Sequence, residues 1–104
     1  MRERLENRRA SVTFEFDLDH LHYTCTVSRF PDGRLGEVFL SNHKGGSQSD
    51  ARARESAIAA SLALQFGCPL ETLRGAVLRN ADGTPSTPLG AALDLVAGNR
   101  GAAS

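Results

Sequence analysis

The sequence predicts an α+β fold, a three-stranded antiparallel meander followed by two or three helices packed on one sheet face. Two observations predict it. Apolar and polar side chains alternate through most of residues 11–41, which is the period of a half-buried strand. From residue 50 onward the chain is rich in alanine and leucine at helical spacing. Strands followed by helices, in a chain of 104 residues, are typical of a single α+β domain.

Two turn sequences separate the predicted strands. The first strand is expected at Ser11–Leu18 and the second at Leu21–Phe30, after a turn at Asp19–His20. The third is expected at Leu35–Ser41, after Pro31–Gly33, where proline presets φ and glycine accepts a positive φ. A meander of three strands leaves two open sheet edges. One face of the first strand is apolar and is formed by Val12, Phe14, Phe16 and Leu18.

A long helix is expected from Asp50 to Phe66, with Ser49 or Asp50 as its N-cap and Gly67 just past its end. On a helical wheel, one narrow stripe is polar and consists of Asp50, Arg54, Ser61 and Gln65. A second row is apolar and consists of Ile58, Leu62 and Phe66. So narrow a polar stripe predicts a helix that is buried over most of its circumference.

Two shorter helices should complete the domain. One is expected at residues 70–80, with Pro69 near its start. The other should begin with Thr87 as N-cap and Pro88 as first residue, and end at Gly98. The organisation expected is therefore an arginine-rich arm at residues 1–10, one domain at 11–98 and a flexible tail at 99–104.

Composition restricts the functions that can be expected. The net charge is zero, which argues against a surface that attracts nucleic acid as a whole. No apolar run is long enough to span a bilayer, and the N-terminus lacks the apolar core of a signal peptide, so we expect a cytoplasmic protein without membrane contact. Cys25 and Cys68 lack a CxxC partner and are expected to be thiols rather than a disulfide.

Several segments together resemble a known module. They are Asp32–Gly33, Glu37–Phe39, the Gly45–Ser47 loop before the alanine-rich helix, and the Gly67 to Pro69 connection to the next helix. In this order they resemble the TSCPD domain, which lies near the C-terminus of many adenosylcobalamin-dependent ribonucleotide reductases and also occurs as a small protein. The resemblance implies a reductase-associated module. The radical-generating barrel, cobalamin site and tail cysteine pair of the reductases have no counterpart here, so neither a cofactor nor catalysis by this chain alone is expected.

The chain departs from the family at the string Thr-Ser-Cys-Pro-Asp, which opens the family's last helix. The corresponding residues here are 85–89, Pro-Ser-Thr-Pro-Leu. Thr87 replaces the cysteine and Leu89 replaces the aspartate, so any redox or metal chemistry of those two groups is lost at this position.

The loop before the long helix has two interpretations. Glycines ahead of a helix N-terminus present free amides to an anion, and basic side chains nearby would add charge. The same residues also suit a simple turn between a strand and a helix. The Gly-Lys-Ser/Thr ending of a nucleoside triphosphatase loop is missing. The residues expected to bind an anion are Asn42, His43, Lys44, Gly45, Gly46, Ser47 and Arg52.

Three further groups of residues have side chains that could form a site. Arg4, Arg8 and Arg9 could contact nucleic acid or a partner protein, although a solvated arm is the alternative and no aromatic residue accompanies them for base stacking. The three histidines lack a fourth ligand at suitable spacing, so no metal site is expected. Cys25 lies on an apolar strand face, where its thiol should be inert.

The sequence therefore predicts a non-catalytic, ribonucleotide-reductase-associated module that binds a nucleotide, another anionic group or a partner protein such as the reductase in trans. One alternative is a structural module that forms a homodimer, since two sheet edges would be open. The other is a protein that binds single-stranded nucleic acid, with an affinity that falls as salt rises.

Overall fold

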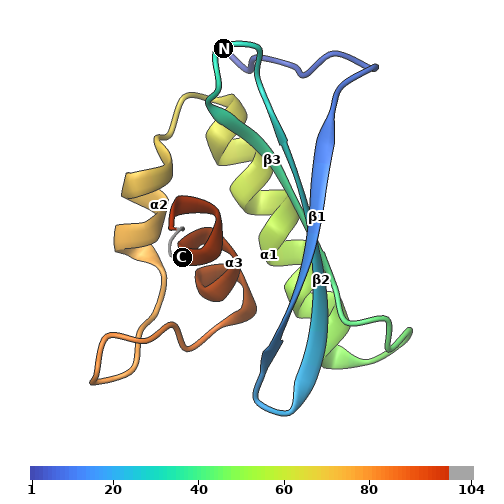
Figure 1. Cartoon of the computed structure of the whole chain (residues 1–104), viewed down its shortest axis with the longest axis vertical. Coiled ribbons are helices and arrows are strands. Elements are labelled where there is room, and N and C mark those ends of the chain that lie inside the picture. Colours follow the sequence, from blue (N-terminus) through green and yellow to red (C-terminus); the bar gives the residue numbers. More distant parts are fainter. Residues whose placement is uncertain (99–104) are drawn as a thin grey trace.

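The sheet is the three-stranded antiparallel meander that the sequence predicts. A computed structural model describes residues 1–98, so the tail predicted at residues 99–104 lies outside the described part (Figure 1). The strands are β1 (Ser11–Leu18), β2 (Leu21–Arg29) and β3 (Leu35–Ser41), in the order β1-β2-β3. The helices α1, α2 and α3 all follow the sheet in sequence, so the α+β class is confirmed.

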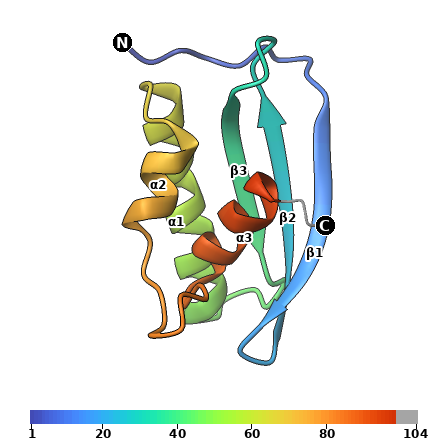
Figure 2. The same ribbon diagram turned by 60° about the vertical axis from the view of Figure 1, so that its left-hand side comes forward.

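The strand register gathers the apolar side chains on one face. Cys25 in the middle strand lies opposite Phe14 of β1 and Leu40 of β3. Because side chains alternate, the same face also receives Tyr23 and Val38. Figure 2 shows the helices on this side of the sheet, with α3 in front of β2 and β3. The core thus lies between one sheet face and the helices.

α1 spans Gln48–Gln65 and begins two residues earlier than expected. Ser47, rather than Ser49 or Asp50, is its N-cap, because the Ser47 Oγ accepts a hydrogen bond from the Asp50 amide at 3.2 Å. The predicted stop is confirmed. Gly67 has φ 100° and the Cys68 amide donates back to the Ala63 carbonyl, as in a Schellman C-cap.

α2 spans Leu70–Ala76 and is shorter than the helix expected at residues 70–80. The chain becomes extended at Val77, and Arg79 then forms an isolated antiparallel bridge with Pro85. Residues 77–80 therefore adopt an extended chain and a turn instead of the last turn of the predicted helix. α3 spans Pro88–Ala97 and starts as predicted.

The orientation of α1 is the reverse of the one predicted. Ser61 and Gln65, from the polar stripe, are buried together with Asp50, whereas the apolar row is exposed. The Ser61 hydroxyl accepts from the Val38 amide at 2.9 Å and donates to the Val38 carbonyl at 3.0 Å. The prediction of a helix buried over most of its circumference is wrong, because a broad face of α1 is exposed, including Arg54 of the polar stripe, Ile58 and Leu62.

These contacts follow the outer edge of β3. The Gln65 Nε2 donates to the Gly36 carbonyl at 3.0 Å, one step along the edge from Val38. Four residues of α-helix rise about 6.0 Å and two residues of strand about 6.6 Å, so the two ladders stay nearly in step. α1 therefore closes one of the two sheet edges expected to be open, and the outer edge of β1 is not paired within residues 1–98.

The N-terminal arm is attached to the domain rather than free. The Glu3 amide donates to the Gln65 carbonyl at 2.7 Å, and the Glu3 carboxylate forms an ion pair with Arg34 at 2.8 Å. Figure 2 shows the arm running across one end of the sheet and α1. Among residues 1–98, no helix is long and apolar enough to cross a membrane.

Candidate functional site

The loop between β3 and α1 is held by its own polar groups. Asn42 and Asp50 are both buried. The Asp50 Oδ1 accepts from the Asn42 amide at 2.9 Å and from the Ser41 hydroxyl at 3.1 Å. The Asn42 side chain accepts from the Lys44 amide and donates to the Ser49 hydroxyl, both at 2.9 Å. Several polar side chains of this segment therefore serve to hold the loop in place.

The start of α1 already contains a negative charge. The hydrogen bond from the Asn42 amide is the main reason that the pKa of Asp50 lies below its usual value, and the Ser41 hydroxyl adds to the effect against the cost of desolvation. An ionised carboxylate near a helix N-terminus is favoured by the helix dipole. The amides of Gln48 and Ser49 donate to no acceptor within residues 1–98 and stay open to an anion. Anion binding at this loop therefore remains a prediction.

The structure brings together only part of the predicted anion set. Asn42 and Ser47 flank the start of α1, and His43, with φ 61°, places its Nε2 3.0 Å from the Thr24 hydroxyl. Lys44, Gly45 and Gly46 are exposed. Arg52 lines a cavity of about 540 Å³ to which Ser49 contributes but none of residues 42–47 does. The diglycine and the guanidinium do not form one constellation.

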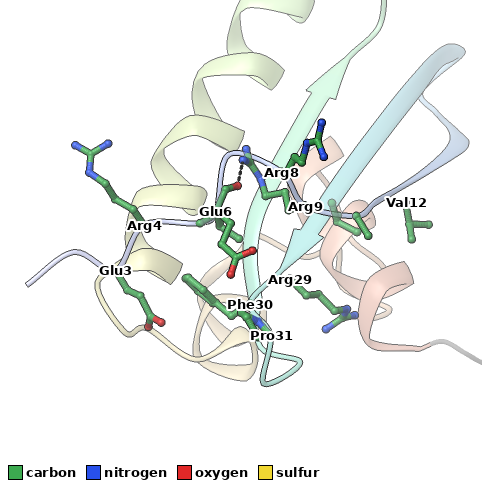
Figure 3. Close-up of a pocket in the computed structure, with 12 residues that line it drawn as sticks. Glu3, Arg4, Glu6, Arg8, Arg9, Val12, Arg29, Phe30 and Pro31 are labelled. Carbon is green, nitrogen blue, oxygen red and sulfur yellow. Dashed lines mark hydrogen bonds between the residues drawn. The ribbon is translucent and has the colours of Figure 1, made fainter.

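The arm and the end of β2 enclose a cavity of about 590 Å³, which we call the arm cavity (Figure 3). Arg9 is occupied, because it pairs with Glu37 at 2.9 Å and donates to the Glu6 carbonyl. Arg4 and Arg8 make no hydrogen bond or ion pair within residues 1–98, and Figure 3 shows their side chains pointing in different directions. The three arginines singled out in the sequence therefore share a cavity without converging on one point.

Aromatic stacking is not available in the arm cavity. Phe30 lines it but is buried, and the Arg34 guanidinium lies 4.7 Å from the centre of its ring. A base could not stack on this ring without displacing Arg34. The arm cavity therefore offers positive charge to a single-stranded nucleic acid but no aromatic ring on which its bases could stack.

Sequence reasoning missed a surface row on α1. Ile58, Leu62 and Phe66 are 57%, 39% and 61% exposed, and we call them the outer row. Phe39, on the open face of the strand that α1 covers, is 48% exposed. The helical wheel shows that these residues form a row, but it does not show which side of the helix packs on the sheet.

The remaining chemistry-bearing residues are accounted for locally. His22 bonds Glu15 and Asp17 on the open sheet face, and these two partners, Glu15 first, raise its pKa. Burial raises the pKa of the Cys25 thiol to about 12, as expected of an inert thiol. Residues 1–98 contain no cluster of three or more histidine, cysteine or acidic side chains arranged for a metal ion.

Comparison with known proteins points in one direction. The chain is 41% identical over 70 residues to the vitamin B12-dependent ribonucleotide reductase of Agrobacterium fabrum, a match that covers 67% of this chain and 6% of that enzyme. The corresponding enzyme of Rhodopirellula baltica is 41% identical over 73 residues, 69% of this chain and 7% of the enzyme. That of Streptantibioticus cattleyicolor is 39% identical over 72 residues, 69% of this chain and 12% of the enzyme.

No family model and no solved structure matches the chain. The chain spans only 6–12% of the length of these three relatives, so the match concerns a small part of a large enzyme. The chain is therefore homologous to a small module of the vitamin B12-dependent ribonucleotide reductases, as the resemblance to their TSCPD domain predicts.

Proposed function

We propose that this chain is a non-catalytic, reductase-related module that docks onto a ribonucleotide reductase through the outer row of α1. The observation that carries the proposal is the exposure of Ile58, Leu62 and Phe66 on a helix that buries Asp50, Ser61 and Gln65. In the relatives, the matching stretch belongs to a chain more than eight times longer than the match, since it covers at most 12% of it. Domains of one chain that pack together do so through interfaces like those of transient protein complexes.

The size of the row suits a docking contact. Full burial of a large apolar side chain contributes about 1.5–3 kcal/mol, and these three are roughly half exposed in the free module. Covering them would contribute about 3 kcal/mol in total. A few such residues often dominate the affinity of an interface.

The test uses the Agrobacterium fabrum reductase, with and without its own matching segment. Binding of the module is measured by titration calorimetry. The triple variant I58S/L62S/F66S should weaken binding by about 100-fold, because about 3 kcal/mol is lost. The matched control is Leu95→Ser, which changes a leucine of comparable exposure, 48%, outside the row. Equal affinities for the triple variant and the control would refute docking through this row.

The same variants separate docking from self-association. If the wild-type module sediments as a dimer and the triple variant as a monomer, a second copy covers the row. In that case the outer row is a homodimer interface, and the proposal that it binds the reductase is wrong. A wild-type monomer that binds the reductase supports the proposal as stated.

A second candidate function is the binding of a phosphate-bearing ligand, a nucleotide or a single strand. It is favoured by Arg4 and Arg8 in the arm cavity, whose charges are not neutralised within residues 1–98. We would titrate ATP and oligo(dT) while following backbone amide shifts. Arm binding should move residues 4–9 and weaken in R4Q/R8Q, whereas loop binding should move residues 45–49. If neither set moves at millimolar ligand, both anion sites are wrong.

A further inference from the structure

The cavity that contains Arg52 lies on the other flank of α1 from the outer row. Its volume is about 540 Å³, within the range of small-ligand sites. The end of the β1–β2 hairpin, the first half of α1 and the segment that leads into α3 form its walls. Most of the lining is apolar and includes Leu18, Leu21, Ala53, Val77, Leu78 and Leu89. We call it the Tyr23 cavity.

Tyr23 gives the cavity its name because its hydroxyl is orphaned. The side chain lines the cavity and is only 3% exposed, yet the hydroxyl makes no hydrogen bond to any of residues 1–98. The ring is fixed by stacking on Phe16, with 5.5 Å between the ring centroids. Nearly all buried polar groups in folded proteins have a partner, and leaving one without costs stability. The partner of this hydroxyl is therefore a water molecule or a ligand in the cavity.

Arg52 is the second group without a partner. It makes no ion pair or hydrogen bond within residues 1–98, although Arg54 on the same helix approaches Asp50 at 3.8 Å. The neighbouring hydroxyls are already in use, since Ser56 donates to the Ala53 carbonyl and Thr87 caps α3. A free guanidinium and a free phenol therefore border one apolar space.

We propose that the Tyr23 cavity binds a small organic anion with an apolar body and one acidic group, a carboxylate or a phosphate ester. Arg52 pairs with the acidic oxygens, as guanidinium groups do with planar or tetrahedral oxyanions. The Tyr23 hydroxyl donates a further hydrogen bond. Asp19, exposed at the hairpin turn and unpaired within residues 1–98, adds a negative charge to the lining and disfavours a second acidic group on the ligand.

The test uses four probes and the full chain. Octanoate and octyl phosphate carry both the apolar body and the acid, octanol lacks the acid, and acetate lacks the body. Titration calorimetry should show binding of at least one acidic probe, and octanol and acetate should bind at least tenfold more weakly. The preferred acid tells a carboxylate ligand from a phosphate ester.

Two substitutions assign the groups. Arg52→Gln should weaken binding of the acidic probe about tenfold or more, as expected for a hydrogen bond to a charged group, and Tyr23→Phe by about threefold. Arg54→Gln is the matched control, since it removes a charge from the same helix outside the cavity, and should leave binding unchanged. Backbone amide shifts should appear at Ala53 and Leu89 rather than along the outer row.

The proposal is overturned if octanol binds as tightly as octanoate, if Arg52→Gln matches Arg54→Gln, or if neither acidic probe binds at millimolar concentration. Tyr23→Phe also gives a check without ligand. Because the hydroxyl has no protein partner, its removal should not lower the melting temperature. A clear drop would mean that the hydroxyl is already satisfied and is not waiting for a ligand.

Discussion

Ser61→Ala should be the most damaging small substitution in α1. The Ser61 hydroxyl is the hydrogen-bond partner of both the amide and the carbonyl of Val38, at 2.9 and 3.0 Å, and both residues are buried. Alanine removes this partner and leaves two backbone groups unsatisfied. Each such group costs about 1–3 kcal/mol, so the gross loss is about 2–6 kcal/mol. The higher helix propensity of alanine offsets about 0.5 kcal/mol of this loss.

The net loss expected is therefore about 1.5–5.5 kcal/mol of the free energy of unfolding, a large part of the roughly 5–15 kcal/mol that such a domain has. Urea denaturation followed by circular dichroism measures it. Ser56→Ala is the control, because its hydroxyl donates only to the Ala53 carbonyl one turn back and lies at a half-buried position. That variant should stay within about 0.5 kcal/mol of wild type. Hydrogen exchange at the Val38 amide should quicken in the first variant only.

A result below about 1 kcal/mol for Ser61→Ala would refute the reasoning. It would mean that water satisfies the Val38 groups as well as the hydroxyl does, and that α1 does not close the edge of β3.

Three other outcomes are expected. The His22 pKa, measured by NMR titration, should lie above 6.5 and fall towards 6.5 in Glu15→Gln. Because the folded-state pKa is raised, the protonated His22 stabilises the fold below pH 6.5, and this stabilisation is lost as the pH rises through the folded-state pKa. Iodoacetamide at pH 8 should modify Cys68 in the native protein but Cys25 only after denaturation, because the buried thiol has a pKa of about 12. Gly36→Ala should cost about 1–3 kcal/mol in urea denaturation, since a Cβ there would lie 2.8 Å from a buried phenylalanine ring.

The strands were predictable because their signals are local. Alternation from Phe14 to Leu18 fixes which side chains pack against the core, and the turn at Pro31–Gly33 fixes where the second hairpin reverses. The α3 start was equally local, since Thr87 accepts from the Gly90 amide as an N-cap should. The end of α2 was missed although its cause is also local: the chain is extended from Val77, and the turn at residues 80–84 brings Arg79 to its bridge with Pro85.

The predicted sites depended on contacts that a sequence does not show. Asp50 was expected to face the amides of its own helix, but it accepts from Asn42 eight residues earlier. Arg52 was grouped with the diglycine loop because it is close in sequence, and the turn of the helix carries it to another cavity. Nothing in the sequence distinguishes a tyrosine with a partner for its hydroxyl from one without, so the sequence does not single out Tyr23.

The error about α1 has a physical cause with consequences for function. A helical wheel assumes that polar side chains face water, which holds when a helix packs on a sheet face that offers only side chains. A helix that lies along a sheet edge meets unpaired amides and carbonyls instead, and short polar side chains such as Ser61 and Gln65 are what that edge requires. Once the polar stripe is used for this purpose, the apolar row at Ile58, Leu62 and Phe66 must turn outward. Closing one edge of the sheet thus creates the exposed surface through which we expect the module to bind its partner.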